Sequence, residues 1–298
     1  MRVLVTGANG LLGQKLIELL STEPNVEVHA TGRGPNRNPP GNYTYHMVDL
    51  AEEGALHNLF EQERPNAVIH TAAMTNVDAC ELDPKECWIQ NVLVVESVVR
   101  ACEHFGCFLT HVSTDFIFDG ASGPYDELAA PNPINVYGKT KLAAEEAVKA
   151  SRLEWAIART ILVYGVAHDP SKSNIVLWVK RSLEQGKAIQ LVTDQWRMPT
   201  LAEDLALGCW LMTKKRAQGV FNISGPDLLT PYEMGRVIAE TFGLDSSLIS
   251  PTDGSAFTQP AKRPAKTGFI LDKARMTLGF EPRRYHEGLA LVKSQFDQ

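Results

Sequence analysis

Short apolar runs alternate with longer amphipathic segments along the first half of the chain. A run such as Arg2–Val5 is apolar nearly throughout, which is typical of a strand covered on both faces. A segment such as Leu11–Leu20 repeats its apolar positions every three or four residues, as an amphipathic helix does. The pattern predicts strands at 2–5, 26–31, 45–48, 67–71, 107–113 and 156–163, and helices at 11–20, 53–62, 84–104 and 136–150.

Strands that alternate with helices of this length predict an α/β fold, with a doubly wound parallel sheet of the Rossmann type. After Gly165 the alternation is less regular, and residues 263–268 read as a loop. We therefore expect a Rossmann domain over residues 1–165, with a returning segment near 200–225, and a smaller α/β lobe over 166–298. The elements predicted there are helices 175–185, 202–214 and 231–242 and strands 189–192 and 220–224.

Composition narrows the class of protein further. The 298 residues carry a net charge of −6 and no long basic run, so no nucleic-acid partner is expected. Without a run of about 18 apolar residues, no membrane partner is expected either. The five cysteines show no C-x-x-C pairing, which favours free thiols in the cytoplasm. His70, His104 and His111 lack metal-ligand spacing, so we expect no metal.

The segment T-G-A-N-G-L-L-G (6–13) joins the first strand to the first helix. In such a loop Gly7 allows a tight turn, Gly10 lets the backbone approach a pyrophosphate, and Gly13 permits close packing of helix on strand. The following helix begins with free N–H groups and the positive end of its dipole. Asn9, Leu11 and Leu12 lie within the same turn, and the sequence therefore predicts a dinucleotide site.

Two positions define the adenosine end of this site. An acid that binds the ribose usually ends the second strand, but here Arg33 follows Gly32. Because an arginine can pair with a 2′-phosphate, the sequence favours NADP(H) over NAD(H). Asp49, followed by Leu50, comes after the third strand and could accept a hydrogen bond from the adenine amino group. The alternative for Asp49 is a helix cap, and for Arg33 an exposed loop residue.

Tyr137 and Lys141 begin a predicted helix and share one face of it, because they are four residues apart. A lysine ammonium beside a phenol lowers the pKa of the phenol, and such a tyrosine can act as a general acid. The strand at 107–113 ends at Ser113 and Thr114. Ligands of open parallel sheets bind at such strand ends, so these hydroxyls could hold a substrate carbonyl. Capping of a turn is their alternative role.

With these motifs the chain resembles the extended short-chain dehydrogenase/reductase family, and within it the dTDP-4-dehydrorhamnose reductases. The motifs span the first two-thirds of the chain, and the last third is similar only in outline. Besides T-G-A-N-G-L-L-G they are D-L (49–50), T-A-A-M-T-N-V-D-A-C-E (71–81), S-T-D-F-I-F-D-G (113–120), N-V-Y-G-K-T-K-L-A-A-E (135–145), R-T-I-L-V-Y-G (159–165) and D-Q-W-R-M-P-T (194–200).

The resemblance implies a catalytic triad of Thr114, Tyr137 and Lys141. It implies a reduction of the keto carbon of a nucleotide-activated sugar by NADPH, as in dTDP-rhamnose biosynthesis, with Tyr137 as the proton donor and with Ser113 and Thr114 against the oxyanion. The residues it places along or behind the cofactor are Ala72, Ala73, Thr75 and Asn91.

One position departs from the reductase pattern. Leu162 stands where the rhamnose-forming enzymes usually carry a tryptophan that packs on the sugar. Arg197 could meet a substrate phosphate, with a surface arginine as the equal alternative. Two other functions stay open: a sugar-nucleotide epimerase or dehydratase that retains NAD, and a regulatory subunit that resembles the beta subunit of methionine adenosyltransferase. The apolar face of helix 84–104 packs either on the sheet or on a second subunit, which leaves a homodimer open.

Overall fold

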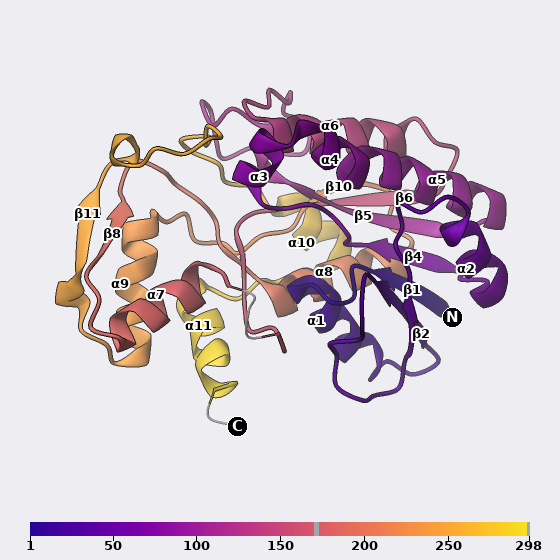
Figure 1. The fold of residues 1–298 in the computed structure, drawn as a ribbon, viewed down its shortest axis with the longest axis horizontal. Coiled ribbons are helices and arrows are strands. Elements are labelled where there is room, and N and C mark those ends of the chain that lie inside the picture. The colour runs from indigo at the N-terminus through magenta and orange to yellow at the C-terminus, as the bar shows by residue number, and fades with distance from the viewer. Residues whose placement is uncertain (170–172, 297–298) are drawn as a thin grey trace.

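The computed structural model describes residues 1–169 and 173–296, and a seven-stranded parallel sheet forms its centre (Figure 1). The strand order is β10-β6-β5-β4-β1-β2-β3. The predicted doubly wound fold is therefore confirmed. The strands are β1 (Arg2–Thr6), β2 (Glu27–Gly32), β3 (Thr44–Met47), β4 (Ala67–His70), β5 (Phe108–Thr114), β6 (Trp155–Thr160) and β10 (Gly219–Asn222).

Helices cover both faces of the sheet, and the alternation of side chains along each strand explains why. In β1, Val3 and Val5 join the core against α1, α8 and α10, whereas Leu4 joins the core against α2, α5 and α6. All three side chains are fully buried. The helices of the two layers are α1 (Leu11–Leu20), α8 (Ala202–Lys215) and α10 (Asp272–Leu278), and α2 (Ala55–Glu63), α5 (Val94–Phe105) and α6 (Val136–Lys149).

The predicted helix 84–104 is interrupted by a wider turn. It follows α3 (Val77–Leu82) and consists of α4 (Pro84–Trp88), a π-helical turn η1 (Ile89–Leu93) and then α5. The spacing of apolar residues did not predict the π-helical turn, because a single wider turn barely changes that spacing. The π turn points Asn91 toward the loop after β4, where its side chain meets the Met74 backbone.

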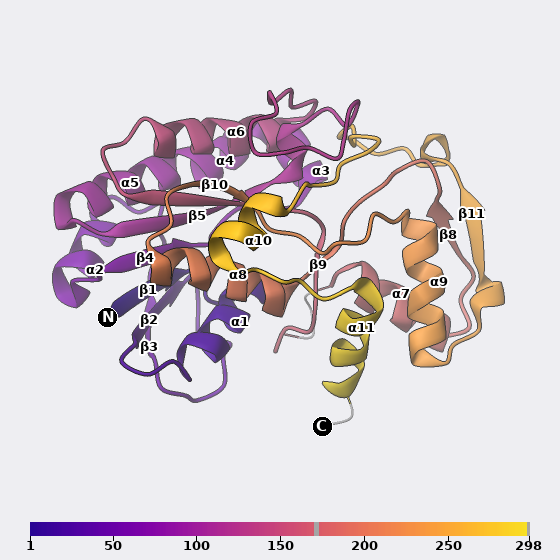
Figure 2. The same ribbon diagram turned by 180° about the vertical axis from the view of Figure 1, so that it is seen from behind.

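A second lobe lies beside the sheet and has its own core, as the views from both sides show (Figures 1 and 2). Its two-stranded parallel sheet pairs β8 with β11, and α9 covers that sheet. A further short pair, β7 with β9, links the lobes. The elements are α7 (Ile175–Glu184), β8 (Ile189–Val192), α9 (Pro231–Phe242), β11 (Ile249–Thr252), α11 (Tyr285–Ser294), β7 (Val163–Tyr164) and β9 (Thr200–Leu201), with 3-10 turns η3 (Ser246–Leu248) and η4 (Gly254–Ala256). A further 3-10 turn, η2 (Asp115–Ile117), follows β5 of the main sheet.

The predicted strand 156–163 is wrong in one respect: it is two strands. β6 ends at Thr160, and β7 begins at Val163 and pairs with β9 instead of with the main sheet. Leu162 separates them with a backbone φ of +40°, in the left-handed region that ends an extended run. Among the described residues, no helix has the length and apolar character needed to cross a membrane.

Candidate functional site

A cavity of about 830 Å³ opens at the carboxyl ends of the central strands. Its walls come from the loops after β1, β2, β4 and β5, from the start of α6, and from the segment that leads into α7. The sequence-predicted residues that line it are Gly7, Asn9, Gly10, Leu11, Leu12, Gly13, Arg33, Asp49, Leu50, Ala72, Ala73, Thr75, Ser113, Thr114, Tyr137, Lys141, Leu162 and Arg197.

Backbone crowding explains two glycines of the first loop. Gly7 has a φ of +68°, and a Cβ there would lie 2.7 Å from the Ala72 backbone nitrogen. A Cβ on Gly13 would lie 2.3 Å from the Gly7 carbonyl oxygen, so only glycine lets α1 pack this closely on the turn. The loop is therefore a cradle with its backbone exposed toward the cavity, and a dinucleotide pyrophosphate fits it chemically.

The Asn9 side chain fixes the loop that follows β2. Its amide nitrogen donates to the Arg33 carbonyl oxygen at 3.2 Å and to the Tyr45 hydroxyl at 2.9 Å, and its carbonyl oxygen accepts from the Arg37 N–H at 3.0 Å. Arg33 and Arg37 both line the cavity from this loop. Arg37, which the sequence reasoning missed, forms an ion pair with Asp169. An arginine four residues after Arg33 in the same loop was the available signal.

The loops after β3 and β4 supply the next part of the wall. Asp49 lines the cavity, and its carboxylate also accepts from the Ala51 N–H at 3.0 Å, which closes a turn. The alternative role as a helix cap is wrong, because α2 begins after Gly54. Asn91 does not line the cavity. Its side chain is fully buried and bonds both backbone groups of Met74, at 2.8 and 3.0 Å, and the Thr140 hydroxyl. Asn91 thus holds the loop before Thr75 in place from behind.

Tyr137 is buried at the start of α6, with its ring edge against Phe116. Burial raises the pKa of its phenol, the hydrogen bond with Thr114 opposes this rise, and the charge of Asp115 adds to it. The sequence argument expected the pKa to be lowered by Lys141. The structure shows the opposite direction, because desolvation dominates and Lys141 is not among the groups that shift this pKa.

Lys141 is buried one turn further along α6. Its ammonium donates to the Val112 carbonyl oxygen at 2.7 Å and lies 3.3 Å from His111 Nε2. Burial lowers the pKa of Lys141 to about 8, and Glu145 partly opposes this shift. His111 stacks on His70 of the adjacent strand, and burial lowers the pKa of both imidazoles. Two neutral rings therefore pack beside one buried amine.

The Ser113 hydroxyl is committed elsewhere. It donates at 2.7 Å to Glu145, whose carboxylate also receives two hydrogen bonds from Arg159, at 2.9 and 2.8 Å. Burial raises the pKa of Glu145, but Arg159 and Lys149 outweigh it, so the net pKa is lowered. Because a serine hydroxyl has one proton to donate, Ser113 cannot also donate to an oxyanion as expected. Its role here is to connect β5 to α6.

Thr114 and Arg197 lie on either side of Asp115. The Thr114 hydroxyl lies 3.1 Å from the Asp115 carboxylate, and Thr267 donates to the other oxygen of that group. Arg197 is buried, not a surface residue, and its guanidinium donates to the Trp196 and Pro264 carbonyl oxygens at 2.7 Å each. Burial lowers the Arg197 pKa and raises that of Asp115, while each charge opposes the other's shift. The cavity wall thus holds a buried pair of opposite charges.

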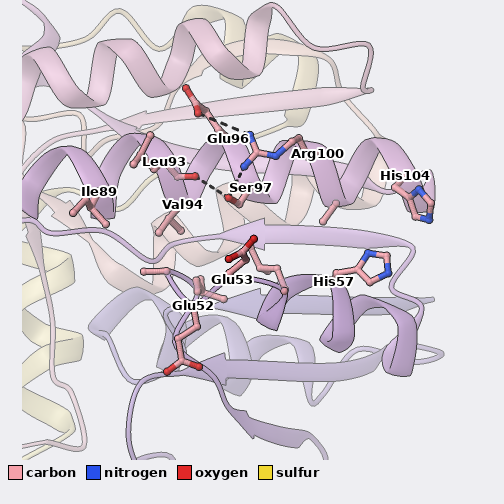
Figure 3. A pocket seen from close by; sticks show the side chains of 15 residues that line it. Glu52, Glu53, His57, Ile89, Leu93, Val94, Glu96, Ser97, Arg100 and His104 are labelled. Carbon is pink, nitrogen blue, oxygen red and sulfur yellow. Dashed lines mark hydrogen bonds and ion pairs between the residues drawn. The ribbon is translucent and has the colours of Figure 1, made fainter.

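A second hollow of about 580 Å³ lies between α2 and α5, on the outer side of the sheet (Figure 3). Its rim carries Glu52, Glu53, His57 and Glu96, and Figure 3 shows Arg100 turned toward Glu96 and Ser97. None of the predicted catalytic residues lines it. Of these two cavities, only the larger one is lined by the predicted catalytic residues.

Comparisons with known proteins agree with this arrangement. The family model described as RmlD substrate binding domain matches residues 1–297. The beta subunit of methionine adenosyltransferase 2 from Bos taurus is 33% identical over 288 residues, which are 95% of this chain and 84% of that protein.

Two solved structures cover nearly the whole chain. A dTDP-4-dehydrorhamnose reductase from Clostridium acetobutylicum has a TM-score of 0.89 and 29% identity, with 100% of each chain covered. A dTDP-4-dehydrorhamnose reductase from Bacillus anthracis, solved in complex with NADP, has a TM-score of 0.86 and 27% identity, with 99% of each chain covered.

Proposed function

The chain belongs to the RmlD substrate binding domain family, and from this premise we propose that it is an NADPH-dependent reductase of the 4-keto group of a nucleotide-activated deoxysugar. The observation that carries the proposal is the meeting of Thr114, Tyr137 and Lys141 with the glycine loop in one cavity. The solved relative with bound NADP supports the choice of cofactor, and Arg33 and Arg37 at the adenosine end support a 2′-phosphate there.

The cofactor supplies a hydride when bound, and the residues of the chain supply orientation and a proton. Tyr137 would be the proton donor to the developing alkoxide, because a phenol carries its proton at neutral pH and this one lines the cavity beside Thr114. The hydrogen bond between Thr114 and the phenol would hold the phenol in place. Lys141, held by the Val112 carbonyl, provides the positive charge beneath this end of the cavity.

The smaller lobe would hold the sugar nucleotide against this centre. Ala167 and the residues at the start of α7 (Ser173, Asn174, Ile175 and Leu177) line the cavity, and Leu162 contributes an apolar side chain. A leucine offers less stacking surface than an indole, so we propose a sugar ring held more by its polar groups than by an aromatic plane. Arg197 would act on the substrate through its positive charge and not through a direct hydrogen bond, because its N–H groups already donate to backbone carbonyls.

The experiment is NADPH oxidation by the purified chain with dTDP-4-dehydrorhamnose, followed by the absorbance of the reduced nicotinamide. Tyr137→Phe should abolish turnover and leave the Kd for NADPH within a few-fold. Tyr232→Phe, which removes a hydroxyl outside the cavity, is the matched control and should leave turnover unchanged. If Tyr137→Phe turns over like the parent chain, the assignment of the proton donor is refuted.

A second function is favoured by one observation, the 33% identity to a methionine adenosyltransferase beta subunit. In this case the chain would bind NADP and regulate a partner enzyme. Tight NADPH binding without oxidation of NADPH, together with co-purification of a methionine adenosyltransferase, would support it. Copurified oxidised NAD would instead point to an epimerase or dehydratase.

A further inference from the structure

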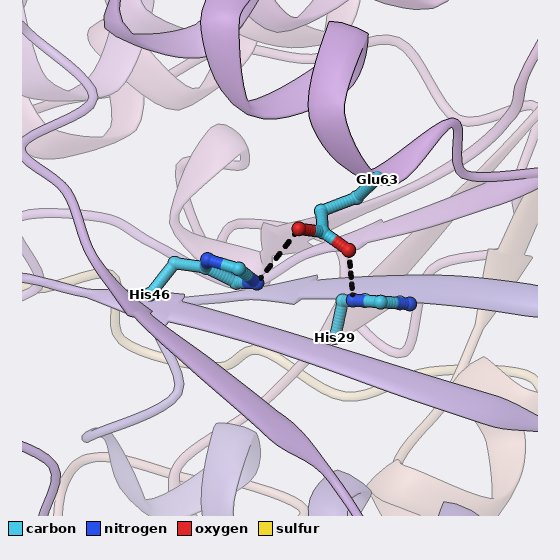
Figure 4. A group of neighbouring side chains, drawn as sticks. All are labelled: His29, His46 and Glu63. Carbon is cyan, nitrogen blue, oxygen red and sulfur yellow. Dashed lines mark ion pairs between the residues drawn. The ribbon is translucent and has the colours of Figure 1, made fainter.

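Two histidines and a glutamate meet at the β2–β3 edge of the sheet, away from the catalytic residues (Figure 4). His29 lies on β2, His46 on the neighbouring strand β3, and Glu63 is the last residue of α2, which packs over them. Their nearest ligand atoms all lie within 4.8 Å of one another. His29 Nδ1 is 2.8 Å from one Glu63 oxygen, and His46 Nε2 is 3.4 Å from the other.

The number of protons does not match the number of acceptors around His29. Its Nε2 lies 3.2 Å from the carboxylate of Glu27, while its Nδ1 faces Glu63. A neutral imidazole has one N–H, so it can serve only one of these two carboxylates. The other ring nitrogen would then direct a lone pair at an oxygen lone pair. Either a second proton, which makes His29 an imidazolium, or a bound cation between the two atoms removes this repulsion.

The atoms that face Glu63 are also those without a hydrogen bond. His29 Nδ1 and His46 Nε2 are both buried, and although each lies near a Glu63 oxygen as an ion-pair contact, neither forms a hydrogen bond of ordinary geometry. The His29 side chain is 4% exposed, that of His46 14% and that of Glu63 12%. A buried polar atom without a hydrogen bond is unfavourable, which indicates that a bound cation completes this cluster.

We propose that His29 Nδ1, His46 Nε2 and the Glu63 carboxylate bind a divalent transition-metal ion of the Zn²⁺ class, with water as the fourth ligand. Two imidazoles and a carboxylate are a ligand set that Zn²⁺ takes, whereas Mg²⁺ and Ca²⁺ prefer oxygen alone. Tetrahedral ligands at zinc distances are about 3.4 Å apart, so the Glu63 spacings of 2.8 and 3.4 Å need little adjustment. The ligand atoms lie within 4.8 Å of one another, so the two imidazoles would move closer together when the ion binds.

Glu27 completes the arrangement as a positioning residue. A metal-bound histidine usually donates its second N–H to a carboxylate, and the Glu27–His29 contact has this form. Arg2 Nε lies 3.9 Å from Glu27 Oε2, whereas Glu27 Oε1 faces His29. The ion would also lie near the carboxyl end of α2, where the helix dipole favours a cation.

The site would tie strand β3 to the rest of the sheet. β3 is an edge strand, and the chain passes from His46 through Met47 directly to Val48, Asp49 and Leu50, which line the large cavity. A metal that joins β2, β3 and α2 would therefore hold the adenosine end of the cavity in place. Because it binds the folded chain, it would also raise the Tm.

The test is calorimetric titration of the tag-free, EDTA-treated full chain with ZnCl₂, with unfolding temperature as a second readout. We expect one ion per chain and a higher Tm. His46→Gln and Glu63→Gln should each weaken the Kd at least tenfold, and Glu27→Gln by a smaller factor. His57→Gln, an exposed histidine outside the cluster, is the matched control and should leave the Kd unchanged. Absence of stoichiometric binding, or equal Kd values in the parent and in both ligand variants, overturns the proposal.

A measurement on the unmodified chain guards against variants that fail to fold. Co²⁺ loaded in place of Zn²⁺ should give the intense visible absorption of tetrahedral coordination. A weak octahedral spectrum, or a spectrum that Zn²⁺ does not displace, overturns the assignment and leaves His29 as an imidazolium held between Glu27 and Glu63.

Discussion

Replacing Arg33 with alanine should lower the affinity for NADPH far more than the affinity for NADH. Arg33 lines the cavity, its side chain is exposed, and its guanidinium makes no hydrogen bond or ion pair to any part of the chain that the structure describes. It is therefore free to pair with a 2′-phosphate. A hydrogen bond to a charged group contributes about 1.5–3 kcal/mol, and exposure places Arg33 at the lower end. A loss of about 1.5–2 kcal/mol corresponds to a roughly 10- to 30-fold weaker Kd.

Arg37 provides an internal comparison, because its guanidinium already forms an ion pair with Asp169. The phosphate must share this cation, so Arg37→Ala should weaken NADPH binding only about two- to fivefold, in the range of an exposed ion pair. The assay is a titration of each variant with NADPH and with NADH at two salt concentrations. At higher salt, the Kd of the parent chain for NADPH should approach that of Arg33→Ala, because salt screens exposed charges.

The reasoning is refuted if Arg33→Ala weakens NADPH and NADH by the same factor. In that case Arg33 would act on the shape of the loop that Asn9 fixes, and not on the 2′-phosphate. Arg33→Lys separates charge from shape: it keeps the positive charge, so it should retain part of the preference for NADPH.

Four further outcomes follow from the structure. Gly13→Ala should destabilise the chain by about 1–3 kcal/mol in urea unfolding, because its Cβ would lie 2.3 Å from the Gly7 carbonyl oxygen; unchanged stability would contradict the crowding. Glu145→Ala should cost about 3–5 kcal/mol, because Arg159 would keep a buried charge without its partner; a change below about 1 kcal/mol would show that water replaces the carboxylate. The kcat/KM for reduction should fall as the pH rises through about 8, where Lys141 loses its charge, and a flat profile to pH 9.5 would remove Lys141 from the mechanism. Because the Lys141 pKa is lowered, the unfolded chain binds this proton more tightly, and the lysine's contribution to stability rises between pH 8 and 10.5.

The sequence predicted the sheet well because its central strands, such as β1 and β4, are buried on both faces and mostly apolar. It predicted β6 and β7 as one strand, because the left-handed backbone of Leu162 has no marker such as glycine. It did not predict α10 and α11, which are short and follow a loop-rich stretch. The apolar faces of α10 and α11 pack on the sheet and on the second lobe, and neither surface can be derived from the local sequence.

For the site, spacing along the chain placed Tyr137 and Lys141 on one helix face, but spacing carries no information on desolvation. The direction of the Tyr137 pKa depends on burial against Phe116, which only the tertiary structure provides. The cluster of His29, His46 and Glu63 has no recognisable sequence spacing either. It forms because β2 pairs with β3 and because α2 ends above that pair.

The return of the chain to the sheet has a consequence during synthesis. β10 (residues 219–222) pairs with β6, and α10 (residues 272–278) packs on β10. Both are synthesised long after the other strands of the sheet. Until β10 arrives, the nascent chain presents β6 as an open edge whose unpaired N–H and C=O groups can capture another strand. The apolar face of β10 and α8 stays uncovered still longer, until α10 arrives. A chain whose synthesis ends between residues 165 and 219 would therefore keep β6 as an unpaired edge, and such a fragment would aggregate more readily than the whole chain.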